Sequence, residues 1–366
     1  MYKFLLIEDS ESDSRSFLDT IKRLNFGKKE TIYNMEVAST YDMGIQLLNS
    51  DYNGVIIDIK LDNGKNGNDI IEKIFEKYRL PIAIFTGTPD VSVNQDIPVA
   101  VYIKGETSHE SIINDLCEIS DTGIYQVLSG TGILEEIMTK IFWRNLYPQM
   151  TVWREKKQQG IETEKILLRY TISHIQELID NDIPAYVTEE MYIKPPISKD
   201  IKTGDIYKDE NIGEYFIVLS PPCDLAVHNG KIKTDRILVC EIENHDEINK
   251  ILIQKGTNAD KKRELIRNSI NNNFTDYYHW LPSNSLFDGG YINFRKVITY
   301  EPDKFRDKFG NAKLKVQDYF VKSIMNRFSA YYARQGQPDF DFKKETKLIY
   351  DKVSVGNSVE TNVINK

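Results

Sequence analysis

Four short apolar runs in the first 120 residues each end at a polar residue suited to chemistry. Stretches with helical periodicity separate the runs, so strands and helices are expected to alternate. Such a chain forms one parallel sheet, and residues just past the carboxyl ends of its strands meet at a single edge. The sequence therefore predicts one functional edge. The polar residues are the pair Glu8 and Asp9, then Asp58, Thr86 and Lys104.

The expected fold class of this part is α/β, with five parallel strands covered by helices on both faces. Apolar content and turn residues place strands over residues 3–7, 31–37, 54–59, 82–85 and 99–103. Helices are predicted between them, including residues 14–24, 69–78 and 108–119. Thr107 or Ser108 is the expected N-cap of the last helix.

The residue types at this edge predict a metal-assisted phosphate site. Three carboxylates, those of Glu8, Asp9 and Asp58, would repel one another unless a hard cation lies between them, and Mg²⁺ suits such oxygen ligands. The metal would also offset negative charge as a phosphoryl group moves onto Asp58. Thr86 offers a hydroxyl to a phosphoryl oxygen, and Lys104 offers a compact cation.

These residues, in this order, resemble the receiver domain of bacterial two-component response regulators over about residues 1–120. The resemblance implies that the protein is a response regulator and a phosphoprotein whose Asp58 accepts a phosphoryl group from a partner histidine kinase. It also implies that Glu8 and Asp9 bind Mg²⁺, helped by Asp58 and the backbone carbonyl of Lys60. Thr86 and Lys104 would then sense the phosphoryl group.

Three positions depart from the family pattern. Gly105 stands where the family usually has proline, and the loop of residues 61–67 lacks a proline and is about one residue longer. Val101 occupies the usual aromatic switch position, whereas Tyr102 should face the opposite side of its strand. We expect phosphorylation to be retained and the usual coupling from threonine to aromatic residue to be altered. The alternative is an acidic crevice that takes no phosphate and serves for docking.

Residues 121–183 are expected to form a helical connector. Two apolar stripes recur there at helical spacing, one over residues 133–142 and one over residues 168–179. Helices with such stripes pack on each other, on the first domain, or on a second copy of the chain. Packing within the chain is the favoured interpretation, and a homodimer is the alternative.

Residues 184–335 are expected to form an output domain of a different kind, a mainly antiparallel β domain resembling a barrel, with added helices. The predicted strands cover residues 185–187, 191–193, 204–207, 214–219, 236–242, 291–294 and 297–300. Helices are predicted over residues 259–271 and 314–334, and residues 336–366 are expected to be a polar, loosely ordered tail.

A rigid turn after one of these strands presents Cys223 and Asp224. Cys223 has three interpretations: a buried structural residue, a nucleophile with a histidine such as His228 or His279 as its base, or a metal ligand. The spacings Cys223 to His228 and Cys240 to His245 match no common zinc motif. The structural interpretation is favoured. An enzyme would bring Cys223, Asp224 and a histidine into one cleft.

Three classes of output remain open from the sequence. The first is a module that binds a protein or RNA, supported by the basic residues 261–267 followed by aromatic residues 274–280. The second is an enzyme, such as a nuclease or toxin-like effector in stress or phage defence, because residues 204–221 loosely resemble small toxin barrels that cleave RNA. The third is a DNA-binding transcriptional regulator acting through residues 261–267.

Composition bounds these interpretations. Residues 1–120 contain 20 acidic and 12 basic residues, which leaves 35 of each for the remainder, and a neutral remainder disfavours a dedicated DNA-binding domain. Only three cysteines occur, so no disulfide framework is expected. The N-terminus does not resemble a signal peptide, and no apolar run is long enough for a membrane span. A cytoplasmic location is expected.

Overall fold

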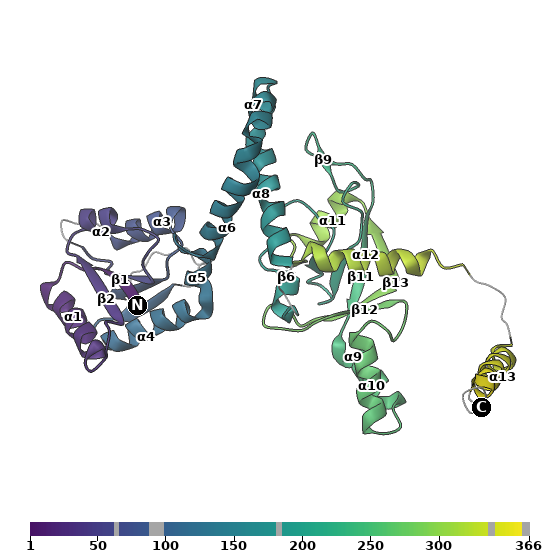
Figure 1. Ribbon diagram of the computed structural model, residues 1–366. Coiled ribbons are helices and arrows are strands. Elements are labelled where there is room, and N and C mark those ends of the chain that lie inside the picture. The colour runs from purple at the N-terminus through teal and green to yellow at the C-terminus, as the bar shows by residue number, and fades with distance from the viewer. Residues whose placement is uncertain (62–65, 88–98, 181–184, 336–340, 361–366) are drawn as a thin grey trace. The chain divides into compact units, whose positions relative to one another are not determined.

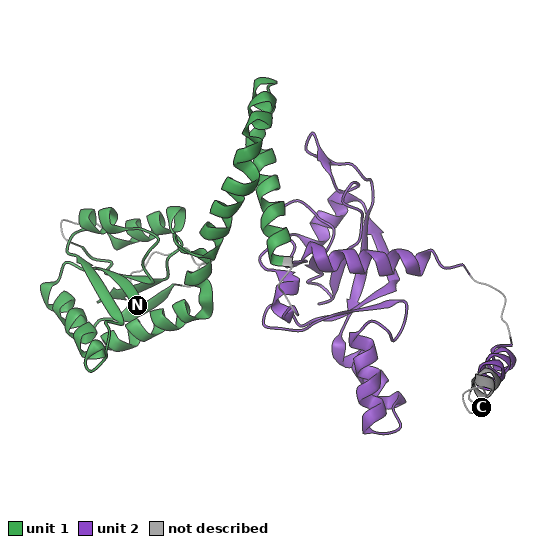
Figure 2. Cartoon of the chain, viewed as in Figure 1, with its two compact units in different colours: residues 1–183 green, residues 184–366 purple. Residues whose placement is uncertain are grey.

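The computed structural model describes residues 1–366 apart from 62–65, 88–98, 181–184, 336–340 and 361–366 (Figure 1). The chain divides into two compact units, residues 1–183 and residues 184–366 (Figure 2). Among the helices of the described ranges, none is both long and apolar enough to cross a membrane.

The first unit contains a sheet of five parallel strands in its described part, in the order β2-β1-β3-β4-β5. The strands are β1 (Tyr2–Ile7), β2 (Tyr33–Ala38), β3 (Gly54–Ile57), β4 (Ile82–Thr86) and β5 (Ala100–Ile103). This order is that of flavodoxin-like and CheY-like folds. Each strand overlaps a predicted one, so the expected fold class is confirmed for this unit.

Helices cover both faces of this sheet because successive strand residues point to opposite sides. Leu5, Ile7 and Ile57 pack against α2 (Tyr41–Leu47) and α3 (Gly67–Lys77). Phe4, Leu6 and Ile56 pack with residues of the helices on the other face. Those helices are α1 (Glu11–Asn25) and α4 (His109–Ile119).

Side-chain caps fix where the helices of the first unit begin. The Ser108 hydroxyl accepts a hydrogen bond from the Ser111 amide at 3.1 Å, which settles which of the two expected residues caps α4. Ser10 caps α1 in the same way, accepting from the Asp13 amide at 3.3 Å. The helix expected between β4 and β5 falls on residues 88–98, outside the described residues.

The rest of the described first unit, up to residue 180, is mainly helical, as expected for the connector. Its α-helices are α5 (Tyr125–Leu128), α6 (Ile133–Ile141), α7 (Met150–Gln158) and α8 (Thr163–Asp180). α7 and α8 pack together, with the Trp153 and Tyr170 ring centroids 5.6 Å apart. Large apolar side chains nevertheless remain exposed on α8 and on the helical turns just before α7. They include Trp143, Tyr147, Leu168 and Ile172.

The second unit contains an antiparallel sheet that curls into a half-barrel, as the expected fold class required. Its described strands follow the order β12-β13-β11-β8-β7-β14-β6. They are β6 (Tyr192–Ile193), β7 (Asp205–Lys208), β8 (Tyr215–Val218), β11 (Ile237–Glu243), β12 (Tyr278–Leu281), β13 (Gly290–Tyr300) and β14 (Leu314–Val316). A separate hairpin joins β9 (Val227–His228) to β10 (Lys231–Ile232).

Helices complete the second unit. They are α9 (His245–Lys255), α10 (Ala259–Ile270), α11 (Pro302–Phe309), α12 (Asp318–Tyr332) and α13 (Phe342–Glu360). The main core lies between the sheet and α12, where Val321 and Ile324 join Ile217, Ile292 and Phe294. A second core lies under α11, where Phe305 and Phe309 pack on Tyr207 and Phe216.

Several element predictions for the second unit are wrong in detail. The helix expected over residues 314–334 begins as strand β14, because Leu314 and Val316 pair with β7 and β6 before α12 starts at Asp318. The two strands expected over 291–294 and 297–300 are one strand, β13, whose pairing with β11 shifts register at a bulge. Residues 185–187 form no strand, and the tail expected to be loosely ordered contains α13.

Candidate functional site

The carboxyl edge of the parallel sheet gathers the polar residues that the sequence singled out. Glu8 directly follows β1, Asp58 follows β3 and Lys104 follows β5, while Thr86 is the last residue of β4. Glu8, Asp58 and Thr86 are buried. Strand pairing fixes this arrangement, since the Asp58 amide donates to the Ile7 carbonyl at 3.0 Å.

The Lys104 ammonium joins three carboxylates from three separate segments. Its Nζ lies 2.7 Å from Oε2 of Glu8, 2.8 Å from Oδ2 of Asp58 and 2.8 Å from Oδ2 of Asp13. The Lys104 side chain is 21% exposed, that of Asp58 is 8% exposed and that of Glu8 is fully buried. Charges held this close in a low-dielectric setting interact far more strongly than surface ion pairs do.

The buried position of Glu8 changes the pKa of its carboxyl group. Burial raises the pKa of Glu8 to about 7, and the hydrogen bond from Lys104 opposes that shift only in part. The pKa of Lys104 is raised in turn: burial acts to lower it, and its hydrogen bonds to Asp13, Asp58 and Glu8 outweigh that effect. The site therefore has an excess of negative charge that a single ammonium does not neutralise.

The same edge has a donor set suited to a hard cation. Oxygen atoms of Glu8, Asp9 and Asp58 all lie within 4.8 Å of one another, and the three residues form the one such group in the described part of the chain. Carboxylate oxygens from the ends of two adjacent strands are ligands that Mg²⁺ takes together with waters. The residues present therefore fit the magnesium ion that the sequence predicted.

Two backbone features shape the space around Asp58. A β-carbon on Gly67 would overlap the carbonyl oxygen of Asp58, so the first turn of α3 approaches the acceptor strand as only glycine allows. The Lys60 amide donates to Oδ1 of Asp58 at 3.3 Å, which orients the carboxylate. The Thr86 carbonyl accepts from the Lys104 amide at 3.0 Å, so these two residues are held side by side.

Asp13 belongs to this site although the sequence analysis did not select it. It lies in the first turn of α1, where the Ser10 hydroxyl accepts from its amide. The signal available in the sequence was this capping pattern, a serine followed three residues later by an acid, directly after the Glu8–Asp9 pair. That pattern predicts only where a helix begins. The ion pair between Asp13 and Lys104 depends on the position of β5, which the pattern does not give.

β5, the strand before Lys104, contains Val101 and Tyr102, whose side chains point to opposite faces of the sheet. Tyr102 packs with the core on the α4 side of the sheet, and its hydroxyl donates to Oδ2 of Asp115 at 2.8 Å. Val101, one residue earlier, is 44% exposed. Tyr102 is thus joined to α4 by a hydrogen bond, and altered coupling between Thr86 and an aromatic residue stays a prediction.

The candidate residues of the second unit do not converge in the same way. Cys223 is exposed, and its thiol contacts the neighbouring Asp224 carboxylate at 3.5 Å. His228 is exposed on the β9–β10 hairpin, whereas His279 is buried on β12. β12 lies three strands from β8 in the sheet, a separation of about 14 Å at ordinary strand spacing. The structure therefore does not bring His279 to Cys223.

The buried cysteine of this unit has a structural environment. The Cys240 thiol donates to the Asn293 carbonyl at 2.8 Å inside the sheet, and burial raises its pKa to about 12. Within the described ranges, no group of potential metal ligands includes Cys223 or Cys240. The metal interpretation of the two cysteine–histidine spacings gains no support.

The segment of basic residues 261–267 and aromatic residues 274–280 lies partly on the surface and partly against the core. On α10, Lys261 pairs with Glu264 at 2.9 Å and Arg263 with Asp260 at 3.9 Å. Tyr278 is half-buried, and its hydroxyl donates to Glu243 at 2.6 Å. Two of the four cations of α10 therefore have an acidic partner on the same helix, and Phe274, Tyr278 and Trp280 pack against a core cluster.

Solved receiver domains align with the N-terminal third of the chain. A CheY-like receiver domain from Methylobacillus flagellatus is 15% identical and covers 32% of this chain and 98% of its own, with a TM-score of 0.27. The signal receiver domain of a LuxO repressor protein from Vibrio parahaemolyticus is 20% identical and covers 35% and 98%, with a TM-score of 0.29. A CheY-like receiver domain protein from Methanospirillum hungatei is 20% identical and covers 33% and 95%, with a TM-score of 0.26.

Independently of these alignments, the strand order of the first unit is the CheY-like order, which is the fold of receiver domains. No protein-family model matches the chain, and no curated protein matches it.

Proposed function

We propose that residues 1–120 are a working receiver and that Asp58 accepts a phosphoryl group from a histidine kinase. The observation that carries this proposal is the convergence of Glu8, Asp9, Asp58 and Lys104 at one edge of the sheet. A structural ion pair needs one carboxylate for one ammonium. Here one ammonium contacts three carboxylates and a fourth, that of Asp9, lies beside them, an arrangement that favours a cation and a transferred anion.

The residues have distinct tasks in the transfer. An Asp58 carboxylate oxygen attacks phosphorus, the bond from phosphorus to the donor breaks, and the leaving group departs with its electron pair. The Lys104 ammonium already contacts Oδ2 of Asp58, and it neutralises a phosphoryl oxygen once the acyl phosphate forms. The Thr86 hydroxyl donates to another phosphoryl oxygen. Mg²⁺, held by Glu8, Asp9 and Asp58, supplies charge neutralisation when it is bound.

We further propose that phosphorylation controls the second unit, which makes the protein a response regulator of a two-component system in the cytoplasm. The separation of Cys223 from His279 supports an output that binds a protein or RNA rather than an enzyme built on these residues. The nuclease or toxin-like alternative would need a catalytic group among other residues. The DNA-binding alternative is weakened because Lys261 and Arg263 of α10 pair with acidic residues of the same helix.

The connector supports a homodimer as part of this proposal. The connector exposes apolar side chains that packing within the described residues leaves open: those of Trp143, Tyr147, Leu168 and Ile172. Light scattering across a concentration series should show a dimer that Trp143→Glu together with Leu168→Glu dissociates. A wild-type monomer at every concentration would contradict this part of the proposal.

Intact mass tests the phosphoacceptor directly. The full chain, incubated with Mg²⁺ and acetyl phosphate, should gain about 80 Da, the mass of one phosphoryl group. Asp58→Asn should gain nothing. Asp69→Asn serves as the matched control, because Asp69 is an exposed carboxylate in the first turn of α3 and should leave the gain intact. No gain in the wild type, with Mg²⁺ binding also absent, would leave the domain as a docking fold.

A further inference from the structure

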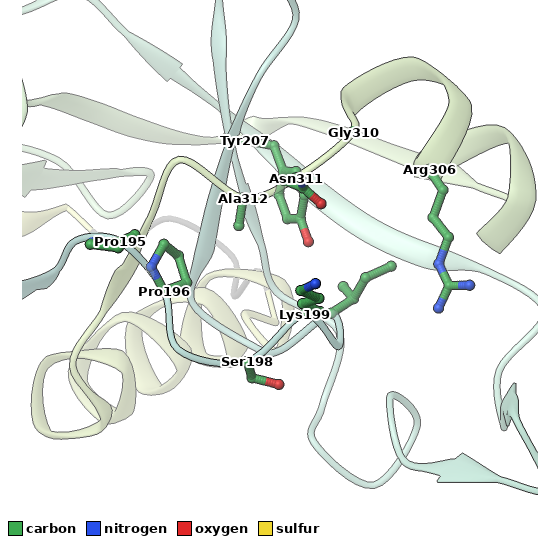
Figure 3. Close-up of a pocket in the computed structure, with 10 residues that line it drawn as sticks. Pro195, Pro196, Ser198, Lys199, Tyr207, Arg306, Gly310, Asn311 and Ala312 are labelled. Carbon is green, nitrogen blue, oxygen red and sulfur yellow. The ribbon is translucent and has the colours of Figure 1, made fainter. Parts of the chain in front are cut away.

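A cavity in the second unit has the chemistry of a binding site and lies apart from the residues discussed so far. Its volume is about 450 Å³, within the range typical of small-molecule sites. Figure 3 shows side chains from separate segments around it. The lining comprises Pro195, Pro196, Ser198, Lys199, Ile201, Tyr207, Arg306, Gly310, Asn311 and Ala312.

Three parts of the fold build this cavity. The irregular segment of residues 195–201 forms one wall, and β7 contributes Tyr207 from the sheet. α11 contributes Arg306 and ends at Phe309, and the next residue, Gly310, has a φ of +63° that turns the chain sharply before β14. That turn places Asn311 at the cavity, on the same side as the Tyr207 hydroxyl (Figure 3).

The charge of the lining is one-sided. Lys199 and Arg306 contribute two cations, and the described residues of the lining include no acid. Cations nearby on the same unit are paired: Lys308 with Asp209 at 2.5 Å and Lys304 with Glu301 at 2.9 Å. Neither Lys199 nor Arg306 makes an ion pair with any described residue under 4.0 Å. Two unpaired cations at one concavity attract an anion.

The uncharged groups complete this pattern. Ser198, Tyr207 and Asn311 offer hydroxyl and amide donors, and burial raises the pKa of Tyr207 so that its hydroxyl keeps its proton. Pro195, Pro196, Ile201 and Ala312 supply apolar surface beside the donors. A guanidinium with several neutral donors suits the three oxygens of a phosphate, and the apolar wall suits a flat organic group.

We propose that this cavity binds a small phosphate-bearing molecule of the nucleotide class, with Arg306 and Lys199 on the phosphate and the proline-rich wall on the base. The site would give the second unit a ligand of its own, independent of the state of Asp58. The unit could then respond to two inputs, phosphorylation of the first unit and occupancy of this cavity.

Isothermal titration of the full chain with AMP, GMP, CMP and UMP tests the proposal, with the four nucleosides and inorganic phosphate titrated in parallel. At least one nucleotide should bind, and its nucleoside should bind at least about tenfold more weakly, a difference of about 1.4 kcal/mol. Arg306→Gln and Lys199→Gln should each weaken that nucleotide by a similar factor. Lys304→Gln, which removes the same charge from the same helix outside the cavity, should change affinity less than about twofold.

The other outcomes overturn the proposal. They are no binding of any nucleotide at millimolar concentration, equal affinity for nucleotide and nucleoside, equal affinity for nucleotide and inorganic phosphate, or an equal loss in Lys304→Gln. An RNA oligomer that binds through Arg306 where mononucleotides do not would reassign the cavity to a macromolecule. Circular dichroism and thermal unfolding of each variant establish that it is folded, and Asp58→Asn should bind the nucleotide as the wild type does.

Discussion

The two sheets of this protein differ in whether they bring polar residues together at one edge. In the parallel sheet, residues that follow β1, β3 and β5 meet within hydrogen-bonding distance around Lys104, although up to 96 positions separate them in the chain. In the second unit, Cys223 lies in the turn after β8, whereas His279 lies on β12, three strands from β8 in the antiparallel sheet. All strands of a parallel sheet end at the same edge, whereas alternate strands of an antiparallel sheet end at opposite edges.

This difference decides how much chemistry a sequence reveals. In an alternating α/β chain, a polar residue after each apolar run is enough to predict a shared site. In an antiparallel chain the same pattern only says that a strand has ended. The cavity of the second unit is an example, because no strand end predicts it. Its two cations, Lys199 and Arg306, come from a loop and a helix that are more than 100 residues apart in the sequence.

The largest expected effect concerns the charge balance of the parallel sheet. Lys104→Met leaves the carboxylates of Glu8 and Asp58 buried without their ammonium, so the first unit should lose about 3 kcal/mol of unfolding free energy in EDTA. Added Mg²⁺ should restore part of that loss. Hydrogen exchange of the full chain, analysed peptide by peptide, reads the two units separately. A loss that Mg²⁺ does not change would mean that no cation binds there.

A somewhat smaller effect tests how closely α3 approaches the acceptor strand. Gly67→Ala places a methyl group against the Asp58 carbonyl, so the first unit should be destabilised by about 2 kcal/mol and the rate of phosphorylation should fall. Gly87→Ala is the matched control, because a β-carbon there meets nothing within 4 Å. The account would be contradicted by equal stabilities of the two variants, measured by chemical unfolding.

An effect of similar size is expected in the antiparallel sheet and concerns pH. Burial lowers the pKa of His279 to about 3, so the folded protein keeps this imidazole neutral while the unfolded chain protonates it near pH 6.5. The stability it contributes is present above pH 6.5 and is lost as pH falls toward 3. Between pH 7 and pH 5 the loss should be about 2 kcal/mol. His279→Gln should remove that part of the pH dependence in urea unfolding, and an unchanged pH dependence would argue against a buried neutral imidazole.

The fold of the first unit could be predicted from the sequence because β1, β3, β4 and β5 each contain a short apolar run and helical periods separate the strands. For the second unit the sequence predicted the fold class, a mainly antiparallel β domain, but not every strand and helix. Leu314 and Val316 follow a helical pattern together with α12, yet pairing with Ile206 and Tyr192 makes them a strand. Those partners lie over 100 positions away, so local periodicity could not decide between helix and strand.

The same limit applies to the sites. Glu8, Asp58 and Lys104 were predictable because the strand ends that carry them share an edge. Asp13 was missed because a helix position, rather than a strand end, brings it to Lys104. The cavity around Arg306 was missed because its residues share no period or motif. Only the turn at Gly310 and the placement of α11 over the sheet bring them together.

One measurement tests the central claim, that phosphorylation of Asp58 controls the second unit. Hydrogen exchange of the full chain is compared with and without acetyl phosphate in Mg²⁺, for the wild type and for Asp58→Asn. The account predicts changed protection both at the carboxyl edge around Lys104 and in peptides of residues 184–335, with neither change in Asp58→Asn. A change confined to residues 1–120, or one that persists in Asp58→Asn, would contradict it.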